Sequence, residues 1–195
     1  MVRAAAGSLV EVEASAEPAV HALRCVDGDR SAWRQLHRRY YPVASAFLRK
    51  LGVDERERED ACQEVFLQMF RYLSRFRGEA DPKTWLYRLC ITQARQVRRR
   101  NKLAHTLQRV LAFLPGEALI SSPGFSERAA QRRVEAALAQ LSEKERSAFV
   151  LYEMEGLAGK EIAAIVGCKE ATLWRRLHEA RQVFRRALAE SEVQP

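Results

Sequence analysis

The sequence predicts an all-α protein built from two small helical domains that a flexible linker joins. Through most of the chain, apolar residues recur at intervals of three and four, which is the period of an amphipathic helix. No segment alternates between apolar and polar residues, so we expect no β-sheet. The helical pattern is interrupted at residues 103–126, where Pro-Gly pairs and serines are typical of a linker. A length of 195 residues suits one or two small domains.

The composition indicates a folded protein with a polyanionic partner. Hydrophobic residues make up 47% of the chain, which is enough for real cores, and the formal net charge is +8. Charge alone does not distinguish DNA, RNA and an anionic membrane surface. No apolar run reaches the ~18 residues of a membrane span, and residues 2–20 lack the apolar segment of a signal peptide. We therefore expect a cytoplasmic protein.

The cysteines predict reduced, buried thiols and not a metal site. They are far apart and form no Cys-X-X-Cys pair, as expected of a protein in a reducing compartment. One histidine stands four residues before a cysteine and would supply half of a zinc site, but no second pair follows. We expect no metal and no cofactor. The residues concerned are His21, Cys25, Cys62, Cys90 and Cys168.

The first domain is predicted at residues 19–102, after a loose tail at 1–18 that is rich in Ala, Ser and Glu. Asp29 is a suitable N-cap for a long helix, and Gly52 ends that helix. The apolar face of this helix steps by three and four residues through Trp33, Leu36, Tyr40, Val43, Phe47 and Leu51.

Two more helices complete this domain. One spans residues 54–75. The other starts at Asp81-Pro82, where the aspartate is the N-cap and the proline takes the first helical position. We expect Trp85 on this helix to lie in the core. The helix then becomes cationic, and its positive charges either contact nucleic-acid phosphates or only solubilise a helix end. These cations are Arg95, Arg98, Arg99, Arg100 and Lys102.

The second domain is predicted at residues 127–189, with a short tail at 190–195. Within it, Ser142 and Glu145 form a capping box that starts a helix, and Gly156 ends that helix. The linker before this domain, residues 103–126, begins with apolar residues at helical spacing: Leu103, Leu107, Val110, Leu111 and Leu114.

A helix-turn-helix follows Gly156. The first short helix has a narrow apolar face, Gly167 breaks it, and a second helix extends from Glu170 to Arg181. This second helix has an apolar face and a cationic free face, so the motif is suited to a DNA major groove. The apolar positions are Ile162, Ala163 and Val166, then Leu173, Leu177 and Ala180; the free positions are Trp174, Arg175, His178 and Arg181.

The sequence has none of the arrangements that catalysis requires. It lacks a phosphate-binding glycine loop, a nucleophile elbow and a cluster of histidines and carboxylates with metal-ligand spacing. The acidic residues between 54 and 60 alternate with Arg56 and Arg58, which is typical of a solvated, self-paired helix face. We expect that the protein is not an enzyme.

Three motifs along the chain together resemble one known family. Residues 60–66 read D-A-C-Q-E-V-F, residues 84–89 read T-W-L-Y-R-L, and residues 155–181 carry E-G-L, E-I-A, V-G, T-L and R-L-H-E-A-R in that order. These stretches are similar to D-L-V-Q-E-V-F, T/A-W-L-Y-R-I and E-G-L…E-I-A…L-G…T-V…R-L-H-R-A-R of sigma-70 RNA polymerase sigma factors. The chain resembles their minimal, extracytoplasmic-function (ECF) group over residues 20–102 and 127–189.

The resemblance implies a function for each domain. The first would hold core RNA polymerase, at the clamp helices of the beta-prime subunit, and trap a flipped base of the promoter −10 element. The second would read the −35 element as duplex DNA. The polymerase-binding residues would be Asp60, Gln63, Glu64 and Phe66. The −10 residues would be Tyr87, Thr92, Gln93, Arg95, Gln96, Arg98 and Arg99, and the −35 residues Lys169, Thr172, Trp174, Arg175, Arg176, His178 and Arg181.

The chain departs from the family pattern at several of these positions. Ile91-Thr92 stands where the family usually has Arg-Asn, so Gln93 or Gln96 would supply the base-capturing amide. In the recognition helix, Trp174 replaces a common lysine or arginine, and Arg175 replaces serine. Trp174 packs either against a thymine methyl or against its own domain, and the sequence leaves both open.

Family members are usually held by an anti-sigma factor, often membrane-anchored, so such a partner is expected here. The apolar face of the linker would bind that partner, pack on the chain's own domains or line a polymerase channel. Two other functions remain as alternatives. A stand-alone DNA-binding regulator would explain residues 127–189 but not the motifs at 60–66 and 84–89. An RNA-binding helical protein is supported only by the charge.

Overall fold

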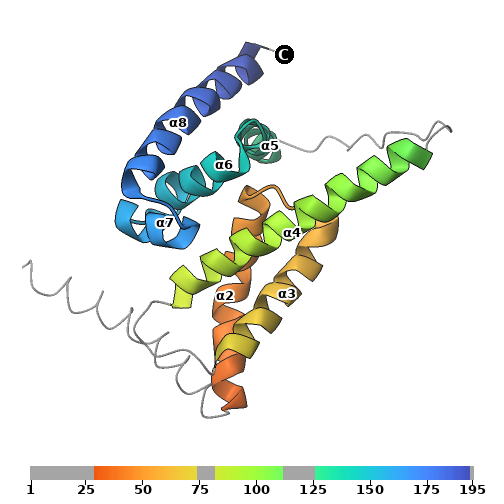
Figure 1. Ribbon diagram of the computed structural model, residues 1–195, viewed down its shortest axis with the longest axis vertical. Helices are drawn as coiled ribbons and strands as arrows, with labels where there is room; N and C mark the ends of the chain where they lie inside the picture. Colours follow the sequence, from red (N-terminus) through yellow and green to blue (C-terminus); the bar gives the residue numbers. More distant parts are fainter. Residues whose placement is uncertain (1–28, 74–81, 112–125, 194–195) are drawn as a thin grey trace, which may run out of the picture. The chain divides into compact units, whose positions relative to one another are not determined.

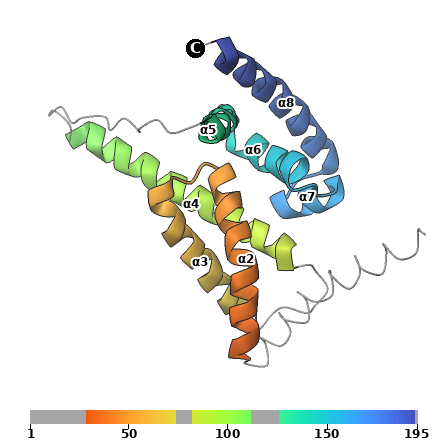
Figure 2. The same cartoon turned by 180° about the vertical axis from the view of Figure 1, so that it is seen from behind.

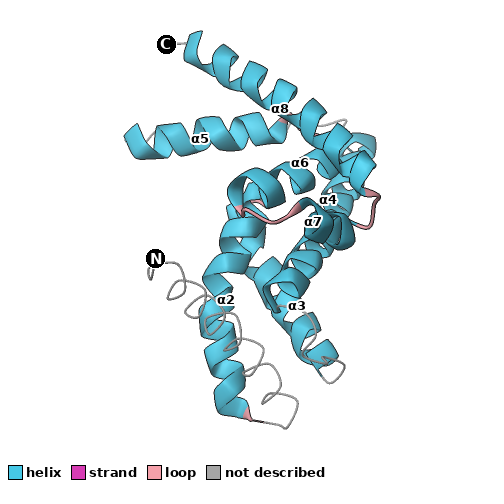
Figure 3. Cartoon of the chain, turned by 90° about the vertical axis from the view of Figure 1, so that its left-hand side faces the viewer, coloured by secondary structure: helices cyan, strands magenta, loops and turns pink. Residues whose placement is uncertain are grey.

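The structure is a computed structural model that describes residues 29–73, 82–111 and 126–193. All regular structure in these ranges is helical, which confirms the predicted all-α class (Figures 1 and 3). The tail at 1–18, the expected cap Asp81 and three residues discussed above, His21, Cys25 and Leu114, lie outside these ranges. The elements are α2 (Arg30–Lys50), α3 (Glu55–Leu73), α4 (Pro82–Leu111), α5 (Ser126–Ala139), α6 (Glu143–Phe149), the π-helical turn η1 (Val150–Met154), α7 (Gly159–Val166) and α8 (Glu170–Val193).

The chain divides into two compact units. The first contains the chain up to Leu48 together with Arg58–Gln93, and the second contains Arg49–Glu57 together with everything from Ala94 onward. The division therefore passes through α4 before the boundary that the sequence suggested at residue 102. Within the second unit, ion pairs join Arg49 to Glu135, Lys50 to Glu155 and Arg95 to Glu143.

The first unit is built on α2, whose start follows the predicted cap. Asp29 Oδ1 accepts hydrogen bonds from the backbone N–H groups of Ser31 and Ala32, at 2.8 and 3.1 Å. The buried face of α2 is rotated slightly from the predicted one, so that Trp33 and Val43 are only half-buried. The predicted Leu36, Tyr40 and Phe47 are buried, and Ala32, Ala44 and Leu48 are buried beside them.

The core of this unit lies between α2, α3 and the first half of α4. Helices α2 and α3 run antiparallel beside each other, and α4 crosses them (Figures 1 and 2). The rings of Phe47 and Tyr87 pack at 4.5 Å between centroids and join α2 to α4. Cys62 and Cys90 are free, buried thiols, and burial raises the pKa of both. Burial is confirmed for these two cysteines and disfavours their thiolates, whereas Cys168 is free but only half-buried.

The helix-turn-helix in the second unit forms as predicted. Leu173, Leu177 and Ala180 of α8 are fully buried, and Gly167 ends α7 in the left-handed conformation, with φ 69°. Helix α8 packs against α5, α6 and α7. One detail differs, because α7 buries Ile165 with Ile162 and Ala163, whereas the predicted Val166 is half-buried.

The helices on either side of α7 differ from the expectation in two ways, because the first contains a π-helical turn and α8 is longer. The capping box at Ser142 and Glu145 is confirmed, with reciprocal bonds of 3.4 and 2.9 Å. Helix α6 then widens into η1 before Gly156, whose φ is 71°. Helix α8 continues to Val193, and Phe184 on this extension packs against Phe149 at 4.6 Å.

A buried arginine ties α6 to the turn after α2 in the second unit. Arg146 is only 8% exposed, and its guanidinium donates to the carbonyl oxygens of Leu51 and Leu141, at 3.0 and 3.4 Å. Burial and the neighbouring Arg98 lower the pKa of Arg146 to about 10, so the side chain still carries its charge at neutral pH. Gly52, next to Leu51, has a φ of 84°, and a Cβ there would run into this guanidinium.

This geometry predicts that Gly52→Ala destabilises the protein more than Gly167→Ala. Both positions are left-handed, which costs an alanine ~1–2 kcal/mol, but only Gly52 is blocked by Arg146, because nothing lies within 4 Å of a Cβ at Gly167. Free energies of unfolding from denaturant titration would measure the difference. Placing Gly52→Ala in an Arg146→Ala background should reduce its cost to that of Gly167→Ala; equal costs in the wild-type background would contradict the role of Arg146.

Candidate nucleic-acid and partner interfaces

The residues expected to bind a protein partner lie on one exposed stripe of α3. Asp60 and Gln63 are exposed and Glu64 is half-buried, and their spacing places them on one face of the helix. Glu64 Oε1 accepts a hydrogen bond from Gln68 Nε2, at 3.0 Å. Phe66, the fourth residue predicted here, is only 3% exposed. Its ring therefore packs beneath this face and is not available for a surface contact.

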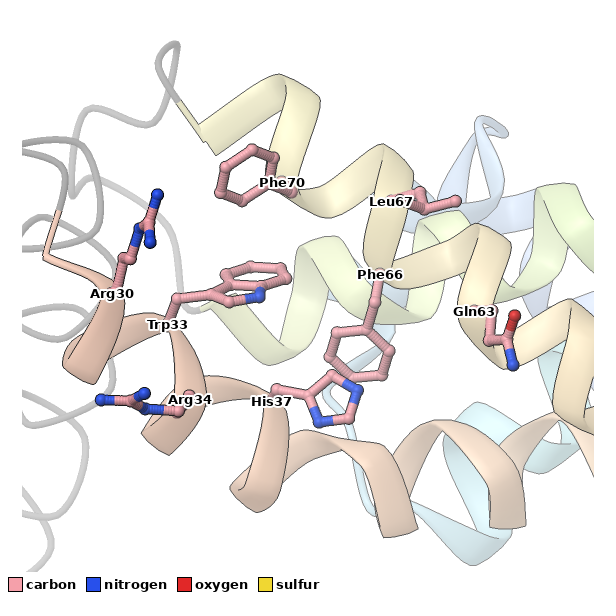
Figure 4. Close-up of a pocket in the computed structure, with 8 residues that line it drawn as sticks. All are labelled: Arg30, Trp33, Arg34, His37, Gln63, Phe66, Leu67 and Phe70. Atoms are coloured by element: carbon pink, nitrogen blue, oxygen red, sulfur yellow. The ribbon is translucent and has the colours of Figure 1, made fainter.

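Phe66 is the centre of an aromatic cluster between α2 and α3. Its ring lies 4.5 Å from that of His37, 6.1 Å from that of Tyr41 and 6.2 Å from that of Trp33, between centroids. Trp33 also meets Phe70 edge-on at 5.1 Å. Figure 4 shows Trp33 and His37 extending from α2 toward Phe66 on α3.

An open groove lies over this cluster. It has a volume of about 600 Å³, and its rim carries cationic side chains on the α2 side and apolar side chains on the α3 side (Figure 4). Leu67 and Phe70 are 51% and 57% exposed, which is unusual for large apolar side chains on one helix. Neither residue was predicted as part of a site, although their spacing from Gln63 places all three on one helical face. The groove is lined by Arg30, Trp33, Arg34, His37, Gln63, Phe66, Leu67 and Phe70.

The residues expected at the −10 element divide into surface and interior positions on α4. Thr92, Gln96 and Arg99 are exposed, and their spacing of four and three residues places them on one face. Tyr87 and Gln93 are buried, at 0% and 5% exposure. Tyr87 therefore packs in the core against Phe47 instead of offering its ring to a base. Of the two candidate amides, only that of Gln96 lies at the surface.

Two of the expected DNA-binding arginines already have partners in the second unit. Arg95 Nε pairs with Glu143 Oε1 at 2.8 Å, and Arg98 Nη2 donates to the carbonyl oxygen of Leu51 at 2.6 Å. Burial lowers the pKa of Arg98 from its ordinary value. Farther along α4, Arg100 and the Asn101 amide approach Glu57, at 3.9 and 2.8 Å. Sequence reasoning did not foresee these contacts, because their partners lie more than 40 residues away.

The recognition helix presents a mixed surface. Arg175 is highly exposed, with 71% of its side chain accessible and only a 4.0 Å approach to Glu179. His178 is exposed and lies 2.9 Å from Gln182, between Nε2 atoms. Lys169 is exposed, and Thr172 and Arg176 are half-buried.

Arg181 and Trp174 are engaged with their own domain. Arg181 pairs with Glu153 at 2.7 Å, and this hydrogen bond raises the pKa of the guanidinium. Its guanidinium carbon also lies 5.4 Å from the centre of the Tyr152 ring. Trp174 meets the same ring edge-on at 5.4 Å and remains 43% exposed. Of the two arrangements that the sequence left open for Trp174, the structure shows packing against its own domain.

Two further findings concern metal binding and membrane crossing. Among the described residues, no three His, Cys, Asp or Glu side chains are grouped so that they could hold a metal ion. Within the same ranges, no helix combines the length and the apolar character that crossing a membrane requires.

Comparisons with known proteins assign both parts of the chain to one family. Residues 36–103 match the family "Sigma-70 region 2", and residues 131–183 match "Sigma-70, region 4". The ECF RNA polymerase sigma-E factor of Escherichia coli K12 is 33% identical over 186 residues, which cover 88% of this chain and 92% of the relative. The RNA polymerase sigma-H factor of Pseudomonas aeruginosa is 30% identical over 170 residues, 83% of this chain and 88% of the relative.

Two solved structures share the fold. CnrH in complex with the cytosolic domain of CnrY aligns with a TM-score of 0.69 and 21% identity, over 89% of this chain and 98% of that one. The sigma factor RpoE in complex with the anti-sigma factor NepR, from Bartonella quintana, aligns with a TM-score of 0.64 and 21% identity, over 83% of this chain and 98% of that one.

The aromatic cluster predicts different costs for truncating two neighbouring phenylalanines. Phe66→Ala removes the buried centre of the cluster and should lower the free energy of unfolding by ~3–5 kcal/mol. Phe70→Ala removes a ring that is already 57% exposed and should cost much less. Denaturant titration of both variants measures the contrast. Similar costs would mean that the ring of Phe66 does not organise the packing of α2 on α3.

Proposed function

The chain belongs to the sigma-70 family of RNA polymerase sigma factors, in the ECF group, and from this we propose that it directs transcription initiation of a specific set of genes. In this function it binds core RNA polymerase, engages promoter −10 and −35 elements, and acts as a cytoplasmic protein without catalysing a reaction itself. The observation that carries the proposal is the presence of both sigma regions in one chain of matching length.

The exposed stripe of α3 is our candidate for the polymerase contact. It combines carboxylates and an amide, at Asp60, Gln63 and Glu64, with the apolar Leu67 and Phe70 at the groove. A polar rim beside an apolar patch is the usual composition of a protein interface. The β′ clamp helices of polymerase are the partner that the family resemblance suggests for this stripe.

The two DNA surfaces divide the work of promoter binding. On α4, Thr92, Gln96 and Arg99 form the exposed candidate face for the −10 element. On α8, Arg175 and His178 are our candidates for contacts with base edges, while Arg176 and, just before α8, Lys169 are suited to phosphates. Tethering through polymerase raises the effective concentration of each surface at its element, so neither needs high affinity alone.

An anti-sigma factor is the regulatory partner that we propose. Both structural relatives were solved with a bound second protein, which in the RpoE structure is an anti-sigma factor. This chain offers two candidate surfaces for such a partner. One is the groove on α2 and α3, and the other is the apolar start of the segment predicted as a linker, residues 103–126. That linker start is helical, because α4 continues to Leu111, and Leu103 on it is 64% exposed.

Run-off transcription with purified core polymerase tests the function directly. A promoter-dependent transcript that requires this protein supports a sigma factor. DNA binding without polymerase-dependent initiation would instead support a stand-alone regulator, and binding to RNA alone would support the third alternative.

For polymerase binding, we expect Asp60→Ala combined with Glu64→Ala to weaken capture of core polymerase without unfolding the protein, because surface substitutions usually change stability by less than ~0.5 kcal/mol. The matched control is Glu55→Ala combined with Glu59→Ala, which removes two exposed acids from the same helix at the same spacing. A pull-down with purified core polymerase measures both. Equal capture by the two double variants would show that the exposed stripe of α3 is not part of the polymerase interface.

For −35 recognition, we expect Arg175→Ala to change base preference and Arg176→Ala to weaken all promoters alike. A bidentate arginine–guanine contact contributes ~1–3 kcal/mol of discrimination, whereas a phosphate contact mainly sets the salt dependence. Transcription from a library of −35 variants at two salt concentrations separates the roles. An unchanged preference in Arg175→Ala would exclude this residue from base reading.

A further inference from the structure

The indole of Trp174 lies where a side chain at residue 159 would otherwise be. Gly159 is the first residue of α7, and a Cβ built on it would stand 2.6 Å from Cζ2 of the indole and 3.2 Å from Cη2. Carbon atoms do not approach to 2.6 Å, so any side chain at residue 159 would have to displace the indole of Trp174. The sequence pattern of the family does not explain this pair, because Trp174 is one of the positions at which the chain departs from it.

The indole makes a second contact, with η1. Trp174 meets Tyr152 of η1 edge-on, with 5.4 Å between centroids and an angle of 81° between planes. Tyr152 also faces the guanidinium of Arg181, which Glu153 holds at 2.7 Å. Trp174 and Arg181 are seven residues apart, about two helical turns. Helix α8 is therefore held against η1 at two points along its length, and against α7 at one of them.

We propose that Trp174 is a positioning residue for −35 recognition, wedged between Gly159 and Tyr152 so that it sets the angle of the recognition helix on α7. This inference rests on the function proposed above. Leu173 and Leu177 bury apolar area beneath α8 but lie on its inner face, whereas Trp174 fills the side of the α7–α8 contact. The angle decides which base edges Arg175 and His178 reach, and base reading tolerates only small displacements.

The wedge predicts a specific dependence between two substitutions. Gly159→Ala places a methyl group in the space of the indole and should force it out; Trp174→Ala removes the indole. Each should change the −35 base preference. In the double variant the new methyl group meets no indole, so its preference should equal that of Trp174→Ala alone. Trp174→Phe keeps an aromatic ring between Gly159 and Tyr152 and should retain part of the wild-type preference.

Transcription from the −35 library with core polymerase, together with denaturation midpoints, provides the test. Lys160→Ala is the matched control, because it alters the next position of α7, which is exposed and lies outside the contact between Gly159 and the indole. Independent, additive effects of Gly159→Ala and Trp174→Ala would overturn the wedge, as would a Gly159→Ala variant with the wild-type base preference. A wild-type protein that supports no promoter-dependent transcription would instead defeat the proposed function, and the midpoints would still show whether the two residues depend on each other.

Discussion

The carbonyl oxygen of Leu51 is the point on which the second compact unit depends. Two guanidinium groups donate to it, Arg98 from α4 at 2.6 Å and Arg146 from α6 at 3.0 Å. The carbonyl lies just past the last residue of α2, where unpaired carbonyls give a helix end partial negative charge. Three stretches far apart in the sequence therefore meet at one atom. The glycine that follows is required twice, for its positive φ and for the space of Arg146.

This arrangement occupies cations that the family resemblance assigns to promoter DNA. Arg98 donates to the Leu51 carbonyl and Arg95 pairs with Glu143, so both guanidinium groups already have partners within the chain. The exposed Arg99 and Gln96 lie between and beside them on α4. In the proposed promoter complex, Arg95 and Arg98 would have to exchange a protein partner for a phosphate, whereas the exposed residues would need no such exchange. If α4 binds promoter DNA as proposed, its surface offers two classes of side chain, one already paired within the chain and one exposed.

Local signals in the sequence predicted most of the fold. The cap at Asp29, the capping box at Ser142 and the left-handed Gly167 depend on residues within a few positions of one another, and all three are confirmed. The buried face of α8 followed from its period for the same reason. The π-helical turn and the length of α8 did not follow, because they depend on packing between helices, such as Phe184 against Phe149. Tyr87 was misplaced because a motif gives a residue's neighbours but not its exposure.

The candidate −35 surface illustrates where sequence reasoning ends and packing begins. Periodicity separates the inner face of α8, at Leu173 and Leu177, from everything else. It treats Trp174, Arg175 and Arg181 alike, although two of them are engaged with η1 and one extends into solvent. The engaged residues hold the helix, and the exposed one remains available for contact. A recognition helix needs both, since a base-reading side chain discriminates only if the backbone beneath it is fixed.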